Sequence, residues 1–130
     1  LFKNMGQAYD GFVARYDLLG AHELSFVLAG KDHDNLWGIS GDCEDQLYIA
    51  GHFSGTADLD PGAGVAMHMS GGMSDAFLLA IDGDGNYRWS RSWSNGDNAT
   101  AQGIGVDGDR MAAGGGRLPS TQPTQAQGTA

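Results

Sequence analysis

Cysteine and glutamate are scarce in this sequence, and long apolar runs are missing. Cys43 is the only cysteine among the 130 residues, so no disulfide can form within them. Glutamate accounts for 2 of the 16 acidic residues and aspartate for 14; aspartate favours turns, whereas glutamate favours helices. No apolar run approaches the ~18 residues that a membrane helix needs. These shortages exclude an internal disulfide framework, argue against a helical bundle and predict no membrane insertion.

Basic residues are few as well. Lysine and arginine total 7 against 16 aspartate and glutamate residues, which gives a net charge of −9 and a pI of about 4.4. Nucleic acids and polyanionic membrane surfaces bind proteins through basic patches that release counterions. The sequence therefore predicts no nucleic-acid partner. An acidic surface suits proteins outside the cell, in high salt or near divalent cations, and charge alone leaves these three open.

Glycine, in contrast, is abundant, with 22 residues, and 41% of the sequence is hydrophobic. Glycine supplies the positive φ angles that tight turns need, and the hydrophobic fraction is sufficient for a core. Each apolar segment is short and is bounded by glycine, aspartate or asparagine. This pattern predicts one all-β unit of about eight strands.

The sequence contains an internal repeat with an offset of 65 residues. When 10–42 is placed over 75–107 without a gap, nine pairs are identical. One deletion later, Gly51 falls on Gly115. Repetition at this period is typical of solenoids and propellers. The identical pairs are Asp10/Asp75, Phe12/Phe77, Asp17/Asp82, Gly20/Gly85, Ser25/Ser90, Asp32/Asp97, Gly38/Gly103, Ile39/Ile104 and Asp42/Asp107.

Hydrophobic residues alternate with period two in both copies, which indicates strands. We expect Phe77, Leu79 and Ile81 to share one face of a strand, with Phe12, Ala14 and Tyr16 as their equivalents in the first copy. On the strand that follows in the second copy, Tyr87, Trp89 and Trp93 are expected on one side. The expected strands lie near 11–17, 22–28, 36–41, 46–53, 76–82, 86–93 and 102–106.

The connections between these strands differ in character. We expect 54–64 to form a long loop with a Pro-Gly turn. The four strands between 36 and 93 should pair into one antiparallel sheet. Residues 116–130 are rich in proline, threonine and glutamine without periodicity, and they are expected to form a flexible tail or linker.

The motifs of both copies resemble one known family. The residues in question are G-H-F-S-G-T-A-D-L-D-P-G-A-G (51–64), G-G-M-S-D-A-F-L-L-A-I-D-G-D-G-N-Y-R-W (71–89) and G-I-G-V-D (103–107). They resemble the bacterial β-propeller repeat called SBBP, and the resemblance covers roughly residues 6 to 115. It implies propeller blades in large secreted or cell-surface bacterial proteins, most of which have no assigned activity.

On this reading, 1–115 is a β-propeller repeat segment of about two blade equivalents. One complete four-stranded blade, about 36–93, is flanked by a half-blade on each side. Because propellers close with about 4–8 blades, the chain is expected to be a fragment of a larger propeller. The outer faces of the half-blades should expose Phe12, Tyr16 and Phe26. We therefore expect further blades of a parent protein, or self-association, to cover them.

Two groups of acidic residues have cation-binding spacing. Asp82, Asp84 and Asn86 occupy the first, third and fifth positions of a Ca²⁺-loop-like segment. The sixth and twelfth positions do not match such a loop, so a hairpin turn explains these residues better. Asp58 and Asp60 precede a Pro-Gly pair, and an Asx-type turn explains them without calcium.

Other residues were considered for chemistry. His22, His33, His52 and His68 have no metal-ligand spacing, and Cys43 has no histidine that would activate it. Phe77, Trp89, Trp93 and Trp37 could stack on sugars, although core packing is the more frequent use. We expect no catalytic, cofactor-binding or metal-binding residue and no enzyme activity. The alternatives are a carbohydrate- or calcium-binding propeller module, or part of a propeller enzyme that resembles quinoproteins.

Overall fold

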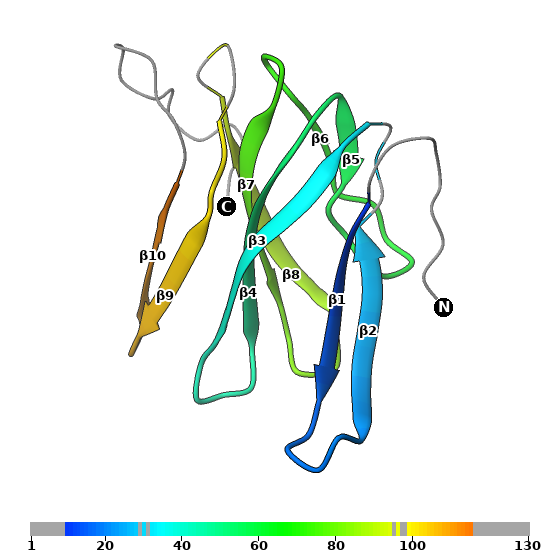
Figure 1. Ribbon diagram of the computed structural model, residues 1–130, viewed down its shortest axis with the longest axis vertical. Coiled ribbons are helices and arrows are strands. Elements are labelled where there is room, and N and C mark those ends of the chain that lie inside the picture. The colour runs from blue at the N-terminus through cyan, green and yellow to red at the C-terminus, as the bar shows by residue number, and fades with distance from the viewer. Residues whose placement is uncertain (1–9, 29, 31, 95, 97–98, 116–130) are drawn as a thin grey trace.

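The all-β prediction is confirmed by a computed structural model, which describes residues 10–28, 30, 32–94, 96 and 99–115. Ten strands and no helix are found in these residues. A four-stranded sheet lies between two hairpins, one on each of its faces (Figure 1). The predicted tail, 116–130, lies outside the described residues.

The strands pair only with antiparallel neighbours. They are β1 (Gly11–Tyr16), β2 (His22–Leu28), β3 (Asp34–Gly41), β4 (Leu47–Phe53), β5 (Thr56–Asp58), β6 (Met67–Met69), β7 (Asp75–Ile81), β8 (Tyr87–Trp93), β9 (Gly103–Asp107) and β10 (Arg110–Gly114). The sheets are β1-β2, β3-β4-β7-β8, β5-β6 and β9-β10. The predicted four-stranded sheet between 36 and 93 is thus confirmed. The prediction of an unstructured loop over 54–64 is wrong in part, because β5 lies within it and is too short to show alternation.

Strand pairing confirms the internal repeat residue by residue. The β1-β2 ladder matches the β7-β8 ladder at an offset of 65, and even its bulge, at Arg15/Tyr16, falls on the bulge at Ala80/Ile81. The β9-β10 ladder matches the β3-β4 ladder in the same way, with Ile104↔Ala113 in the place of Ile39↔Ile49. The first hairpin therefore corresponds to the second half of the central sheet, and the last hairpin to its first half.

The central sheet is buried on both faces. On one face, Phe53, Phe77 and Leu79 pack with Val13 and Leu28 of the first hairpin. On the other, Ala50 and Leu78 pack with Ala99 and Ala101, which precede β9. All seven residues of β7 are buried. The alternation along β7 distributes its side chains between the two cores.

Two expectations about side-chain direction were wrong. Tyr87 packs into the first core, whereas Trp89 and Trp93 pack against the second. The bulge between Ala80 and Ile81 inserts one residue in β8 and reverses the alternation at Tyr87. Phe26 is half-buried against the first core rather than exposed, because it lies opposite Val13 on the inner face of the hairpin.

Three hairpin turns share one aspartate-based design. Asp17, Asp42 and Asp82 each accept two backbone N–H groups at 2.9 Å through Oδ1, from the residues two and four positions later. In each turn the fourth residue has a positive φ, with 89° at Gly20, 88° at Gly85 and 67° at Asp45. Asp45 is the single described non-glycine residue with positive φ, and the left-handed region costs a non-glycine residue free energy.

Replacing Asp45 with glycine is therefore expected to stabilise the protein by about 0.5–1 kcal/mol. The lost ion pair with Arg15 has an N–O distance of 3.6 Å and an aspartate side chain that is 76% exposed, so it contributes little. Urea unfolding of Asp45→Gly and Asp45→Ala measures the effect, since alanine removes the same charge without relieving the backbone. Equal stability of the two variants would contradict the explanation.

Candidate interaction surface

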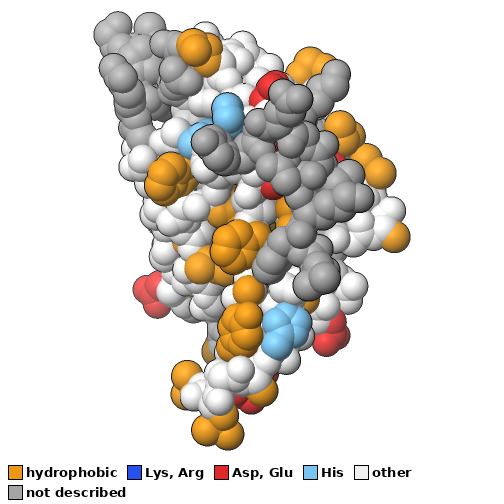
Figure 2. Space-filling model, turned by 45° about the vertical axis from the view of Figure 1, so that its right-hand side comes forward, with side chains coloured by type: hydrophobic (Ala, Val, Ile, Leu, Met, Phe, Trp, Pro, Cys, Tyr) orange, Lys and Arg blue, Asp and Glu red, His pale blue; other side chains and the backbone are white. Residues whose placement is uncertain are grey.

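The first hairpin turns an apolar face outward. Phe12 and Tyr16 are 60% and 56% exposed, as the repeat predicted. They alternate with buried Val13, so the strand has one face in the core and one on the surface. In Figure 2 the side of the molecule carrying the first hairpin comes forward, and hydrophobic side chains are distributed down it. Large apolar side chains gathered on one surface are typical of interaction sites.

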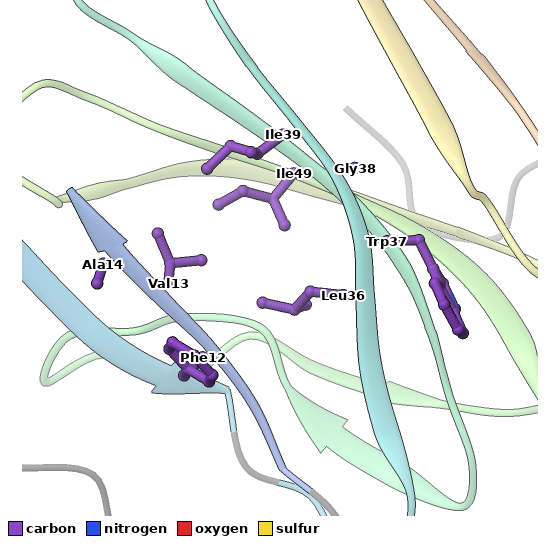
Figure 3. A pocket seen from close by; sticks show the side chains of 8 residues that line it. All are labelled: Phe12, Val13, Ala14, Leu36, Trp37, Gly38, Ile39 and Ile49. Carbon is purple, nitrogen blue, oxygen red and sulfur yellow. The ribbon is translucent and has the colours of Figure 1, made fainter.

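A groove of about 310 Å³ separates β1 from β3. Val13, Leu36, Ile39 and Ile49 point into the space between the two strands, whereas Trp37 lies on the other side of β3 (Figure 3). Ile39 is 53% exposed. Within the described residues, β1 pairs only with β2 and β3 only with β4, so each has one unpaired edge. The groove is therefore apolar and is bordered by strands that can accept a further strand.

The last hairpin offers the second unpaired surface. All residues of β10 are exposed except Met111, which is half-buried, and β10 pairs only with β9 among the described residues. A Cβ added at Gly115 would overlap the carbonyl oxygen of Thr100, just as one added at Gly51 would overlap that of Asn35. The hairpin thus reproduces the backbone environment of β3-β4 but lacks the neighbour that β4 has in β7.

Trp37 forms a separate exposed feature on the outer side of β3. A bulge in the β3-β4 ladder between Leu36 and Gly38 places Trp37 outside the regular pairing. Its Nε1 donates to His52 Nδ1 at 2.9 Å, and the two rings stack with centroids 6.1 Å apart. Because the indole N–H can only donate, the His52 proton lies on Nε2, which is 3.2 Å from the Asn35 side-chain amide. These bonds hold an exposed indole ring in one orientation.

Acidification is expected to break the Trp37–His52 hydrogen bond. Burial, followed by the neighbouring His33, lowers the pKa of His52 below its ordinary 6.5. The fold favours the neutral ring, so the stability from this contact is present above pH 6.5 and is lost as pH falls through the lowered pKa. The Trp37 indole N–H resonance, followed by NMR from pH 8 downward, should shift in that range. His52→Gln should abolish the transition and His22→Gln should retain it, whereas a transition that persists without His52 would contradict the assignment.

The two proposed calcium segments are turns in the structure. Asp82 uses Oδ1 for the backbone N–H groups of Asp84 and Asn86, and its Oδ2 accepts from the Asn86 side chain at 3.2 Å. The hydrogen bond from Asn86 N–H contributes most to lowering the pKa of Asp82. Asp58 Oδ1 accepts from Asp60 and Ala66, at 3.0 and 2.8 Å. The same turn geometry at Asp17 and Asp42, without matching oxygen ligands, assigns the carboxylates to turn capping.

His68 has a structural environment that the sequence did not reveal. Its Nδ1 is 2.9 Å from Ser92 Oγ and its Nε2 is 2.8 Å from Ser90 Oγ. Ser90 also contacts the Tyr87 hydroxyl at 2.8 Å. Both serines are buried, and burial lowers the pKa of His68. This network attaches the β5-β6 hairpin to β8, and the signal in the sequence was only the unusual pair of inward-facing serines.

Several other candidates are placed apart from one another. Cys43 is exposed in the turn between β3 and β4. Phe77 is buried, and Trp89 lies half-buried against the second core with the Arg91 guanidinium 5.2 Å from its ring centroid. Among the described residues, no group of three or more His, Cys, Asp or Glu side chains is arranged to hold a metal ion. The described part of the chain also has no helix capable of spanning a membrane.

Asp34 is an acidic residue that the sequence reading did not single out. It is 3% exposed, and neither carboxylate oxygen has a well-aligned hydrogen-bond partner. Burial and the negative charge of Asp10 raise the pKa of Asp34 to about 7, against the influence of the Gly30 N–H. At its equivalent position in the second copy stands Ala99, which carries no charge.

The comparisons with known proteins assign no family. No model of a protein family matches the chain, and none of the curated proteins matches it significantly. The fold and the two half-sheets therefore carry the functional argument.

Proposed function

We propose that this chain is a non-enzymatic β-propeller repeat segment, acting as a scaffold or interaction surface of a larger secreted or cell-surface bacterial protein. The observation that carries the proposal is the division of the chain into one complete four-stranded sheet and two half-sheets. The half-sheets correspond to opposite halves of the complete one. Repeats of this kind bury their faces against neighbours, so isolated ends need a partner.

The exposed side chains support an association function. Phe12 and Tyr16 occupy the positions at which Phe77 and Ile81 are fully buried in the second copy. Burial of these side chains in an assembly would remove apolar area from water at about 25 cal/mol per Å². The resemblance of 51–64 and 71–89 to the SBBP repeat supports the propeller class and the extracellular or surface location. Further blades of the parent, another protein or a glycan remain the partner classes in this proposal.

Sedimentation velocity at micromolar concentration tests the proposal. The chain is expected to associate, and Phe12→Thr should shift it toward the monomer because the outer face of β1 loses its aromatic group. Leu18→Thr is the matched control, since Leu18 is equally apolar and fully exposed but lies in a turn. A compact monomer with a cooperative melt would contradict the proposal and indicate a self-sufficient small β-domain.

A further inference from the structure

The edges of β1 and β10 lack the neighbour that their equivalents have. In the complete sheet, β3 and β8 are the edges, and β4 pairs with β7 at the centre. By the repeat, β10 corresponds to β4 and β1 corresponds to β7. The outer edges of β9 and β2 match edges that are open in the complete sheet too. The missing pairing is therefore one between β10 and β1.

We propose that β10 of one copy pairs antiparallel with β1 of a second copy, giving a second four-stranded sheet in the order β9-β10-β1-β2. This inference rests on the proposed function and names its partner as another copy of the chain. In the complete sheet, Leu47 pairs with Ile81 and Ile49 with Leu79. Transferred by the two offsets, this register places Met111 opposite Tyr16, Ala113 opposite Ala14 and Gly114 opposite Val13.

The position of β9 supports the same arrangement. Within one chain, β9 lies beside β3, and a Cβ added at Gly38 would lie 3.2 Å from the Gln102 carbonyl oxygen. A partner hairpin on β1 would place its β9 alongside β3 in the same manner. The groove between β1 and β3 lies where this hairpin would enter (Figure 3). The small side chains of Ala112 and Ala113 permit close approach of the two strands.

Charge complementarity favours a second copy. In the complete sheet, the Arg88 guanidinium donates to the Gln46 side-chain carbonyl across β8 and β4. The equivalent of Arg88 is Glu23, and the equivalent of Gln46 is Arg110. Pairing of two copies would thus bring Arg110 of one chain to Glu23 of the other, converting a polar contact into an ion pair. Arg110 and Glu23 are both exposed in the single chain.

Disulfide trapping tests the register. In a Cys43→Ser background, Ala14→Cys combined with Ala113→Cys should form a ladder of intermolecular disulfides, because directly opposed residues have the required separation. Ala14→Cys with Ala112→Cys is the matched control, since Ala112 and Ala14 would lie on opposite faces. Equal cross-linking of both pairs would overturn the register. Association of the Cys43→Ser chain without selective cross-linking would refute this pairing alone, whereas a monomer would contradict the proposed function as well.

A charge-exchange experiment provides the second readout. Arg110→Glu and Glu23→Arg should each weaken association by about tenfold, because each brings like charges together at every contact. Mixing the two variants should restore association, since each tail then meets an oppositely charged head. Failure of the mixture to associate more tightly than either variant would overturn the pairing. Folding of each variant is checked by its thermal melt.

Discussion

Asp34→Asn is expected to raise the free energy of unfolding at pH 8 by on the order of 4 kcal/mol and to change it little near pH 4. The carboxyl group is 3% exposed, and its pKa in the fold is about 7 against an ordinary value of 3.8. Because the fold binds the proton more tightly than the unfolded chain, the wild type loses stability as pH rises from 3.8 to about 7. Asparagine carries no charge to bury, so its stability should not fall in this range.

Urea unfolding of both proteins at several pH values measures this difference. Asp32→Asn is the matched control, since Asp32 is an exposed carboxylate next in the chain and contributes only a small repulsion to Asp34. Its pH profile should remain close to that of the wild type. If Asp34→Asn gave the same gain at pH 4 as at pH 8, the buried charge would not be the cause.

Gly51→Ala is expected to destabilise the protein by at least about 3 kcal/mol. A Cβ at this position would overlap the Asn35 carbonyl oxygen and would lie 2.9 Å from the Phe77 ring. The carbonyl belongs to β3, so relief requires β3 and β4 to separate at the centre of the sheet. Phe77 is 1% exposed and has no room to move without opening the first core.

Gly105→Ala is the control for this substitution. Gly105 also lies within a strand, but a Cβ there would meet no atom within 4 Å. The variant should have nearly unchanged stability because alanine and glycine differ little on an open strand surface. Thermal melts of the two variants decide the matter, and similar melting temperatures would show that the β3-β4 approach is looser than described.

Much of the β-structure was accessible from local patterns. Period-two alternation and glycine or aspartate turns located all four strands of the central sheet, with small differences at their ends. Asp82 and Asp58 were correctly interpreted as turn residues, because their hydrogen bonds are made within the same short segment. The β5-β6 hairpin was missed because three-residue strands carry too little alternation to be distinguished from a loop.

The interaction surface divides differently between sequence and structure. The offset of 65 residues already implied that the two ends of the chain match opposite parts of its middle, and the exposure of Phe12 and Tyr16 followed from that. The bulge that turns Tyr87 away from Trp89, and the groove beside β1, depend on strand pairing that no local pattern specifies. The complementarity of Glu23 and Arg110 became visible only when the register was known.

Local sequence therefore determined the strands, the turns and the repeat, since each depends on side chains a few residues apart. Tertiary structure decided which faces are buried, because burial depends on what packs against a strand rather than on the strand. Asp34 is the clearest example. Its position in the sequence resembles that of many exposed aspartates, and only the packing around it removes the carboxylate from water and raises its pKa.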